Sequence, residues 1–198
     1  GFGVVLAALL SGGMTDRCWR LVSTGVMLLI VAEPVALLGQ IALLAPARLV
    51  DLGFAADVLL TRYGHLSALR LAGALGLWAL AGAVRTGPPR AQWAIPAAAM
   101  PVAVVYAASA HRIDGLPSSI AMLLVATHVA AFGAWLGCIV VALRESRGRQ
   151  LERPAVLTAV VLVLSGSGLA LAHIPAPSGL IETAYGATLG IKIALVAA

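Results

Sequence analysis

The apolar positions of this chain fall in long runs, several of which reach the roughly 20 residues that a helix needs to cross a hydrocarbon core. A short segment over residues 48–62, amphipathic or re-entrant, precedes one of them. The pattern predicts an all-α, polytopic transmembrane bundle of about seven spans in one integral membrane domain, residues 1–198. The predicted spans cover residues 19–45, 65–84, 92–110, 119–143 and 154–174, with partial spans over 1–13 and from about 185 onward.

Composition supports this class and excludes others. Hydrophobic residues make up 61% of the chain, against roughly 45–50% in soluble domains, and charged residues only 11%. The net charge of +5 comes from loop arginines, and no Lys/Arg run with interleaved aromatics suggests nucleic acid as a partner. Both ends of the chain lie inside apolar segments, so we expect sequence to be missing at both.

Loop charges predict the orientation of the spans. The loops after the first, third and fifth spans are rich in arginine, whereas the alternate loops are nearly balanced. Positive loops face the cytoplasm, so we expect a multi-pass protein of the bacterial inner membrane with its odd-numbered loops cytoplasmic. The arginines of these odd loops are Arg17, Arg20, Arg85, Arg90, Arg144, Arg147, Arg149 and Arg153.

A four-point motif occurs twice: Thr-x-Tyr-Gly, then five further residues, then a basic residue. From Thr61 to Thr183, and from Arg70 to Lys192 alike, the offset is 122 residues. Four spans separate the copies, so both face the same way and predict a parallel repeat. We expect eight helices in two four-helix halves, about 1–112 and 113–198, the second truncated. The two motifs comprise Thr61, Tyr63, Gly64, Arg70, and Thr183, Tyr185, Gly186, Lys192.

The corners predict helix starts, in which Thr caps free N–H groups, Tyr anchors at the interface and Gly permits the turn. A weaker match supports the repeat: residues 20–40 can be laid over residues 153–173, which places Gln40 and His173 at equivalent outer ends.

All four histidines are predicted on the outer half of the bundle, which suggests a site loaded from outside. His65, His111 and His173 lie at interfacial depth, where an imidazole that merely caps a helix is the competing interpretation. His128 lies roughly 14 Å inside the fifth span, where an ionisable group is costly and is a functional candidate. Its competing interpretation is a neutral imidazole bonded to a neighbouring helix.

Other polar or soft side chains could line a pathway. Met122 lies one and a half turns outward of His128, though not on the same face. Glu33 is the most deeply buried acid and precedes Pro34, which removes a backbone donor and frees a carbonyl. Arg70 and Lys192, within their spans, need a carboxylate, carbonyls or a snorkelling route. Glu182 completes this polar set. Cys18 and Cys138 fall on the cytoplasmic half, where a disulfide is not expected.

Soluble enzyme motifs are missing from the sequence, which contains no Cys-x-x-Cys, no phosphate-binding Gly loop before Lys-Ser/Thr and no His-Glu-x-x-His. The second half instead resembles the CopD family of bacterial inner-membrane copper resistance proteins. The resemblance rests on Thr127-His128, then Trp135-Leu136-Gly137, then Ser165-Gly166-Ser167-Gly168, and the Thr183 corner leading to Lys192. Residues 106–111 (YAASAH) resemble the family's Gly-His segment.

The resemblance covers residues 106–198 well and 48–84 moderately. Cys138 stands where the family has a second Gly, and Ala110 replaces the Gly before His111. The CopD resemblance implies a non-enzymatic protein that moves copper toward the cytoplasm, with a periplasmic copper-binding protein as a candidate partner. His111, His173 and His65 would then form an outer acquisition site, His128 with Met122 would pass the ion inward, and Glu33 would provide a polar step.

Two other functions stay open. Related membrane proteins hold haem b between helices with histidines, as b-type cytochromes or protoporphyrinogen-oxidase-like enzymes. A single deep histidine argues against paired axial ligation in the bilayer. The third possibility is a non-transporting membrane subunit or sensor.

Overall fold

The computed structural model describes residues 1–48, 51–109, 117–146 and 148–173, and every regular element in these ranges is helical. This confirms the predicted all-α class. The elements are α1 (Phe2–Leu10), α2 (Asp16–Leu44), η1 (Pro46–Arg48), α3 (Leu52–Leu59), α4 (Arg62–Val84), η2 (Pro89–Trp93), α5 (Ala94–Ala108), α6 (Ser118–Glu145) and α7 (Gly148–His173).

Five helical segments among the described residues are long and apolar enough to cross a membrane: Asp16–Leu44, Arg62–Val84, Pro89–Ala108, Ser118–Glu145 and Gly148–Ala172. They correspond to the five complete spans predicted from the sequence. The partial first span forms only the nine-residue α1, and the predicted seventh span lies outside the described residues. The segment after α2 is short, as expected, with η1 followed by the eight-residue α3.

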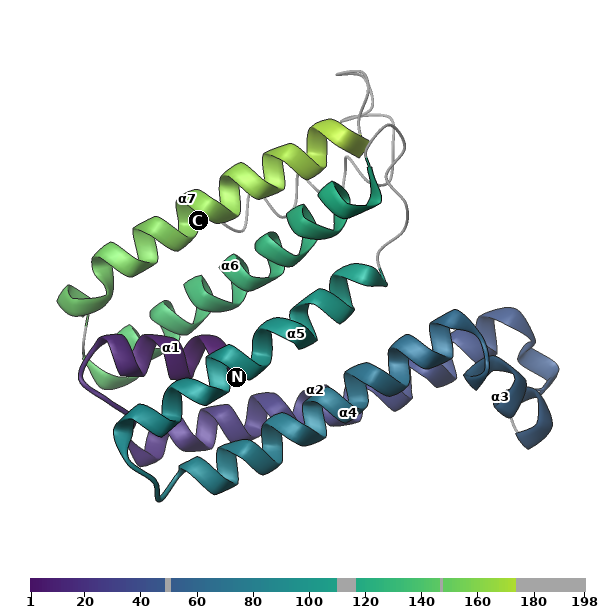
Figure 1. The fold of residues 1–198 in the computed structure, drawn as a ribbon, viewed down its shortest axis with the longest axis horizontal. Coiled ribbons are helices and arrows are strands. Elements are labelled where there is room, and N and C mark those ends of the chain that lie inside the picture. Colours follow the sequence, from purple (N-terminus) through teal and green to yellow (C-terminus); the bar gives the residue numbers. More distant parts are fainter. Residues whose placement is uncertain (49–50, 110–116, 147, 174–198) are drawn as a thin grey trace.

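The helices α4, α5, α6 and α7 lie side by side in succession, and α2 runs along α4 (Figure 1). Neighbours pair as α2 with α4, α4 with α5, α5 with α6, and α6 with α7. The short α1 lies against α6 and also contacts α2 and α5, while α3 lies beside α4 at one end. Chain neighbours are therefore mostly spatial neighbours, and α1 is the exception.

Glycines allow α1 to approach α6 closely. A Cβ built on Gly3 would lie 1.8 Å from the carbonyl oxygen of Gly133, and one on Gly137 would lie 2.1 Å from the carbonyl carbon of Gly3. The ring of Phe2 covers Gly133, with its Cε1 2.4 Å from the Cβ position. Small residues at such a contact let two backbones pack tightly where the hydrophobic effect contributes little.

The core consists mainly of small and branched apolar side chains from α1, α2, α5 and α6, and α4 and α7 contribute further apolar side chains. Val5, Val22 and Val141 are fully buried, and Cys18 and Cys138 are free thiols packed among them. Large apolar side chains also point outward along the long helices, including Leu143 at 79% and Leu171 at 78% exposure. An apolar exterior is what a helix facing lipid requires.

Two side-chain hydrogen bonds connect three loops at one end of the bundle. The Thr15 hydroxyl donates to Glu145 Oε1 at 3.0 Å, which joins the start of α2 to the end of α6. Arg85 Nη2 donates to Asp16 Oδ1 at 3.4 Å, which adds the end of α4. The loops predicted to share one side of the membrane therefore lie together. Which side is cytoplasmic stays a prediction.

Candidate functional site

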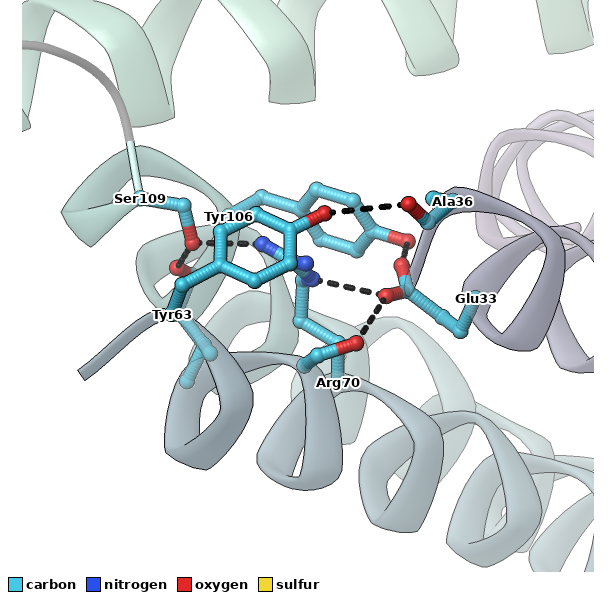
Figure 2. Close-up of polar contacts among 8 residues, drawn as sticks. Glu33, Ala36, Tyr63, Arg70, Tyr106 and Ser109 are labelled. Atoms are coloured by element: carbon cyan, nitrogen blue, oxygen red, sulfur yellow. Dashed lines mark hydrogen bonds and ion pairs between the residues drawn. The ribbon is translucent and has the colours of Figure 1, made fainter. Parts of the chain in front are cut away.

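A network of polar side chains is buried between α2, α4 and α5, and Glu33 lies at its centre (Figure 2). This carboxylate is only 5% exposed. Its Oε2 accepts from Arg70 Nε at 2.9 Å and from the Ser67 hydroxyl at 3.3 Å. Its Oε1 accepts a short hydrogen bond from the Tyr106 hydroxyl. Three donors from two neighbouring helices therefore satisfy one carboxylate.

The Arg70 guanidinium is similarly enclosed, at 6% exposure. Besides Glu33 it reaches Ser109, with Nη1 2.6 Å from the hydroxyl oxygen, and Ser109 in turn donates to the Val105 carbonyl at 2.9 Å. The rings of Tyr106 and Tyr63 lie 5.2 Å and 5.8 Å from the guanidinium carbon, within cation–π range. Figure 2 shows the cation held between these groups.

A buried ion pair is tolerated when both charges are paired and hydrogen-bonded, because either charge alone would carry its full desolvation cost. The sequence analysis required a carboxylate, carbonyls or a snorkelling route for Arg70. The structure provides the carboxylate, and it is Glu33. Three donors bond to the two oxygens of Glu33, so most of its acceptor capacity is already used within the network.

Residues at the start of α4 explain how this helix positions its side chains in the Glu33 network. Thr61 caps the helix by accepting from the Gly64 N–H at 3.2 Å, as its motif predicted. A Cβ on Gly64 would lie 2.4 Å from Leu59 Cα, so the turn from α3 into α4 requires glycine there. Tyr63 was expected to anchor at the interface; its hydroxyl donates to the Ala36 carbonyl of α2 at 3.5 Å.

His128 forms a second polar contact between α6 and α7. Its Nδ1 lies 3.2 Å from the hydroxyl oxygen of Ser165, which is buried. That hydroxyl donates to the Val161 carbonyl at 2.7 Å, which leaves its oxygen lone pairs to accept from Nδ1–H in the tautomer that carries the proton there.

Glycine at position 166 sets the space around this imidazole. A Cβ there would lie 3.0 Å from His128 Cε1 and 3.4 Å from Nδ1. The ring therefore packs directly against the backbone of α7. The bond to a neighbouring helix, which was the competing interpretation of His128, is present.

The other predicted ligands are not brought to His128 in the described residues. His65 is exposed in the first turn of α4, and Met122 is 37% exposed on α6. No group of three or more His, Cys, Asp or Glu side chains suited to a metal occurs within the described ranges. Outside those ranges lie His111, Glu182, Thr183, Tyr185, Gly186, Lys192 and the side chain of His173.

The sequence analysis did not assign Tyr106, Ser67 or Ser109 to the site. Ser67 lies one turn before Arg70, on the same face of α4, and this spacing was a usable signal. Tyr106 was noted only within the stretch that resembles a family motif. Nothing in the sequence specified that α5 would place its last turn against Glu33.

Together, these features define a class: over the described residues the protein is all-helical, with five helices apolar enough to cross a membrane, as a multi-pass membrane protein requires. No family model matches the chain, and no match was found among curated proteins or solved structures.

Proposed function

We propose that this protein takes up copper across the bacterial inner membrane, as the CopD resemblance implies, with His128 as the ligand inside the bilayer. The observation that supports this most directly is the His128–Ser165 contact at 3.2 Å. A histidine ligand commonly donates its second ring N–H to a fixed acceptor, which selects the tautomer and orients the ring. Imidazole and thioether are suitable copper ligands.

The proposal includes the predicted architecture of two parallel four-helix halves. His111, His173 and His65 form an outer acquisition site, Met122 and His128 pass the ion inward, and Glu33 is the polar step beyond them. The Glu33–Arg70 pair makes that step conditional, because an ion that binds Glu33 competes with Arg70, Tyr106 and Ser67 for the carboxylate.

Haem is the competing ligand, and the packing around His128 disfavours it. The imidazole lies against the α7 backbone at Gly166. A haem bound there needs a wide apolar slot, so α6 and α7 would have to separate. Copper needs only a small cluster of converging ligands.

Metal analysis and visible spectra of the purified protein, oxidised and reduced, test this proposal. We expect about one copper per chain and no Soret band. His128→Asn keeps a polar group near Ser165 but removes the imidazole, so it should lose the copper. Met27→Leu, on the exposed surface of α2, is the matched control and should retain it.

Unchanged copper binding and uptake in His128→Asn would refute the pathway. A Soret band that shifts on reduction would transfer the function to haem-dependent electron transfer or porphyrin oxidation. A Met122→Leu variant tests the role of Met122 separately from that of His128. A weaker copper affinity in this variant would support Met122 as part of the pathway, and an unchanged affinity would exclude Met122 from it.

A further inference from the structure

Three arginines converge on one hollow at the arginine-rich end of the bundle. The hollow has a volume of about 240 Å³ and is lined by Arg17, Arg20 and Leu21 of α2 and by Arg144 of α6. The sequence distance between the two groups exceeds 120 residues, so the fold brings them together. The Thr15–Glu145 hydrogen bond fixes the two helix ends beside each other.

The arginines that line this hollow have no ion-pair partner in the described part of the chain, since none of the ion pairs there includes Arg17, Arg20 or Arg144. Of the acids next to them in sequence, Asp16 pairs with Arg85, and Glu145 accepts from the neutral Thr15 hydroxyl. Three like charges around one hollow repel each other, and a bound anion would remove this repulsion.

The position of the hollow indicates which anion. Arg17 and Arg20 lie in the first turns of one candidate span, and Arg144 lies in the last turn of another, so all three are at headgroup level. Leu21 lines the hollow, and Leu143, which precedes Arg144 in α6, is 79% exposed. Guanidinium groups match phosphate oxygens in pairs of parallel hydrogen bonds, and basic pockets between spans suit anionic headgroups.

We propose that the Arg17–Arg20–Arg144 hollow is a binding site for a phosphate group, supplied by an anionic lipid headgroup. Its volume is below the roughly 300–1,000 Å³ of pockets for drug-sized ligands, which suits a headgroup whose acyl chains stay on the apolar surface outside. The site does not depend on copper transport and is tested separately.

The test titrates the purified full chain in detergent with a short-chain phosphatidylglycerol, and in a parallel arm with inorganic phosphate. Binding is followed by native mass spectrometry and by the thermal midpoint. We expect phosphatidylglycerol to bind about fivefold more weakly for each arginine changed to glutamine in the hollow. The matched control removes the same charge from the same end at Arg90, Arg149 and Arg153, which do not line it.

The two arms distinguish the sources of the phosphate group. Binding of phosphatidylglycerol that is lost in the hollow variant but kept in the control supports the lipid source. Equal binding of inorganic phosphate supports the site but assigns it to a free anion. Equal losses in the hollow variant and the control, or no binding to wild type, would overturn the proposal. If the triple glutamine variant does not fold, Arg144→Lys provides the test instead, because it keeps the charge at this position. An unchanged affinity for phosphatidylglycerol in Arg144→Lys would contradict paired guanidinium contacts.

Discussion

The Glu33 network and the His128 contact both place polar groups between membrane-length helices, but they satisfy them differently. Glu33 and Arg70 are charged, and side chains from α4 and α5 surround them. At His128, the Ser165 hydroxyl of α7 lies 3.2 Å from the ring Nδ1. The charged pair requires a rigid shell, whereas a contact between an imidazole and a hydroxyl can exchange partners at lower cost.

The predicted repeat sharpens this contrast. When residues 20–40 are laid over residues 153–173, Glu33 falls on Gly166. In the first half, that position carries the carboxylate that pairs with Arg70. In the second half, it carries no side chain, and the imidazole of His128 occupies the adjoining space. On this alignment, one position carries a buried carboxylate in the first predicted half and leaves space for the His128 imidazole in the second.

The largest effect is expected from removing one partner of the buried pair. Glu33→Leu or Arg70→Met leaves the other charge buried and unpaired, which costs about 3–5 kcal/mol of unfolding free energy. The double substitution should cost less than either single one, because it buries no charge. Thermal or denaturant unfolding measured by circular dichroism would check this.

The exposed Arg85–Asp16 pair offers a matched control for this prediction. Both side chains are more than half exposed, so Arg85→Met should cost no more than about 1 kcal/mol. Equal losses in the buried and exposed pairs would contradict the closed network seen around Glu33.

The next largest loss of unfolding free energy is expected at the glycine contact between α1 and α6, which joins the two predicted halves. Gly137→Ala places a methyl group 2.1 Å from the backbone of Gly3, so α1 and α6 must separate, at a cost of about 1–3 kcal/mol. Gly76→Ala is the control, because nothing lies within 4 Å of its Cβ position. If both variants unfold alike, α1 does not pack on α6 in the membrane.

The His128 contact should affect ligand affinity more than folding. Ser165→Ala removes the acceptor that fixes the imidazole tautomer, so copper affinity should fall about 10–100-fold. Ser167→Ala changes an exposed hydroxyl two residues away and should leave affinity unchanged. Equilibrium titration with a competing chelator would measure both, and equal affinities would exclude a positioning role for Ser165.

The smallest effect on stability is expected from Asp51, whose carboxylate is partly exposed, whereas that of Glu33 is buried. Asp51 accepts from the Phe54 N–H and from Arg48, and these bonds lower the pKa of Asp51 below its usual value of about 3.9. Its support for the start of α3 is therefore complete above that value and is lost as the pH falls through the lowered pKa.

Amide exchange at Phe54 as a function of pH would measure the Asp51 effect. Protection should fall in acid for wild type, and Asp51→Asn should remove the dependence. A pH-independent amide in wild type would show that the cap does not form.

Much of the fold was predictable because lipid imposes one rule on every span: backbone groups must bond internally, so long apolar runs become helices. The cap at Thr61 and the turn at Gly64 were also predictable, since both depend on residues close in sequence. The partners of Glu33 were less so, because Tyr106 and Ser109 reach it only through the packing of α5. The packing of α1 against α6, and the arginine hollow, likewise depend on contacts between distant segments.

The glycine contact between α1 and α6 also has a consequence in time. Its two sides are separated by about 130 residues, and ribosomes add roughly 5–20 residues per second. During synthesis, α1 must therefore wait on the order of 10 s before Gly133 and Gly137 exist. Until then, Gly3 presents bare backbone that other small-residue helices can contact. The time at which the α1–α6 contact can close is set by the emergence of α6, and a pause in translation before that point would prolong this exposure.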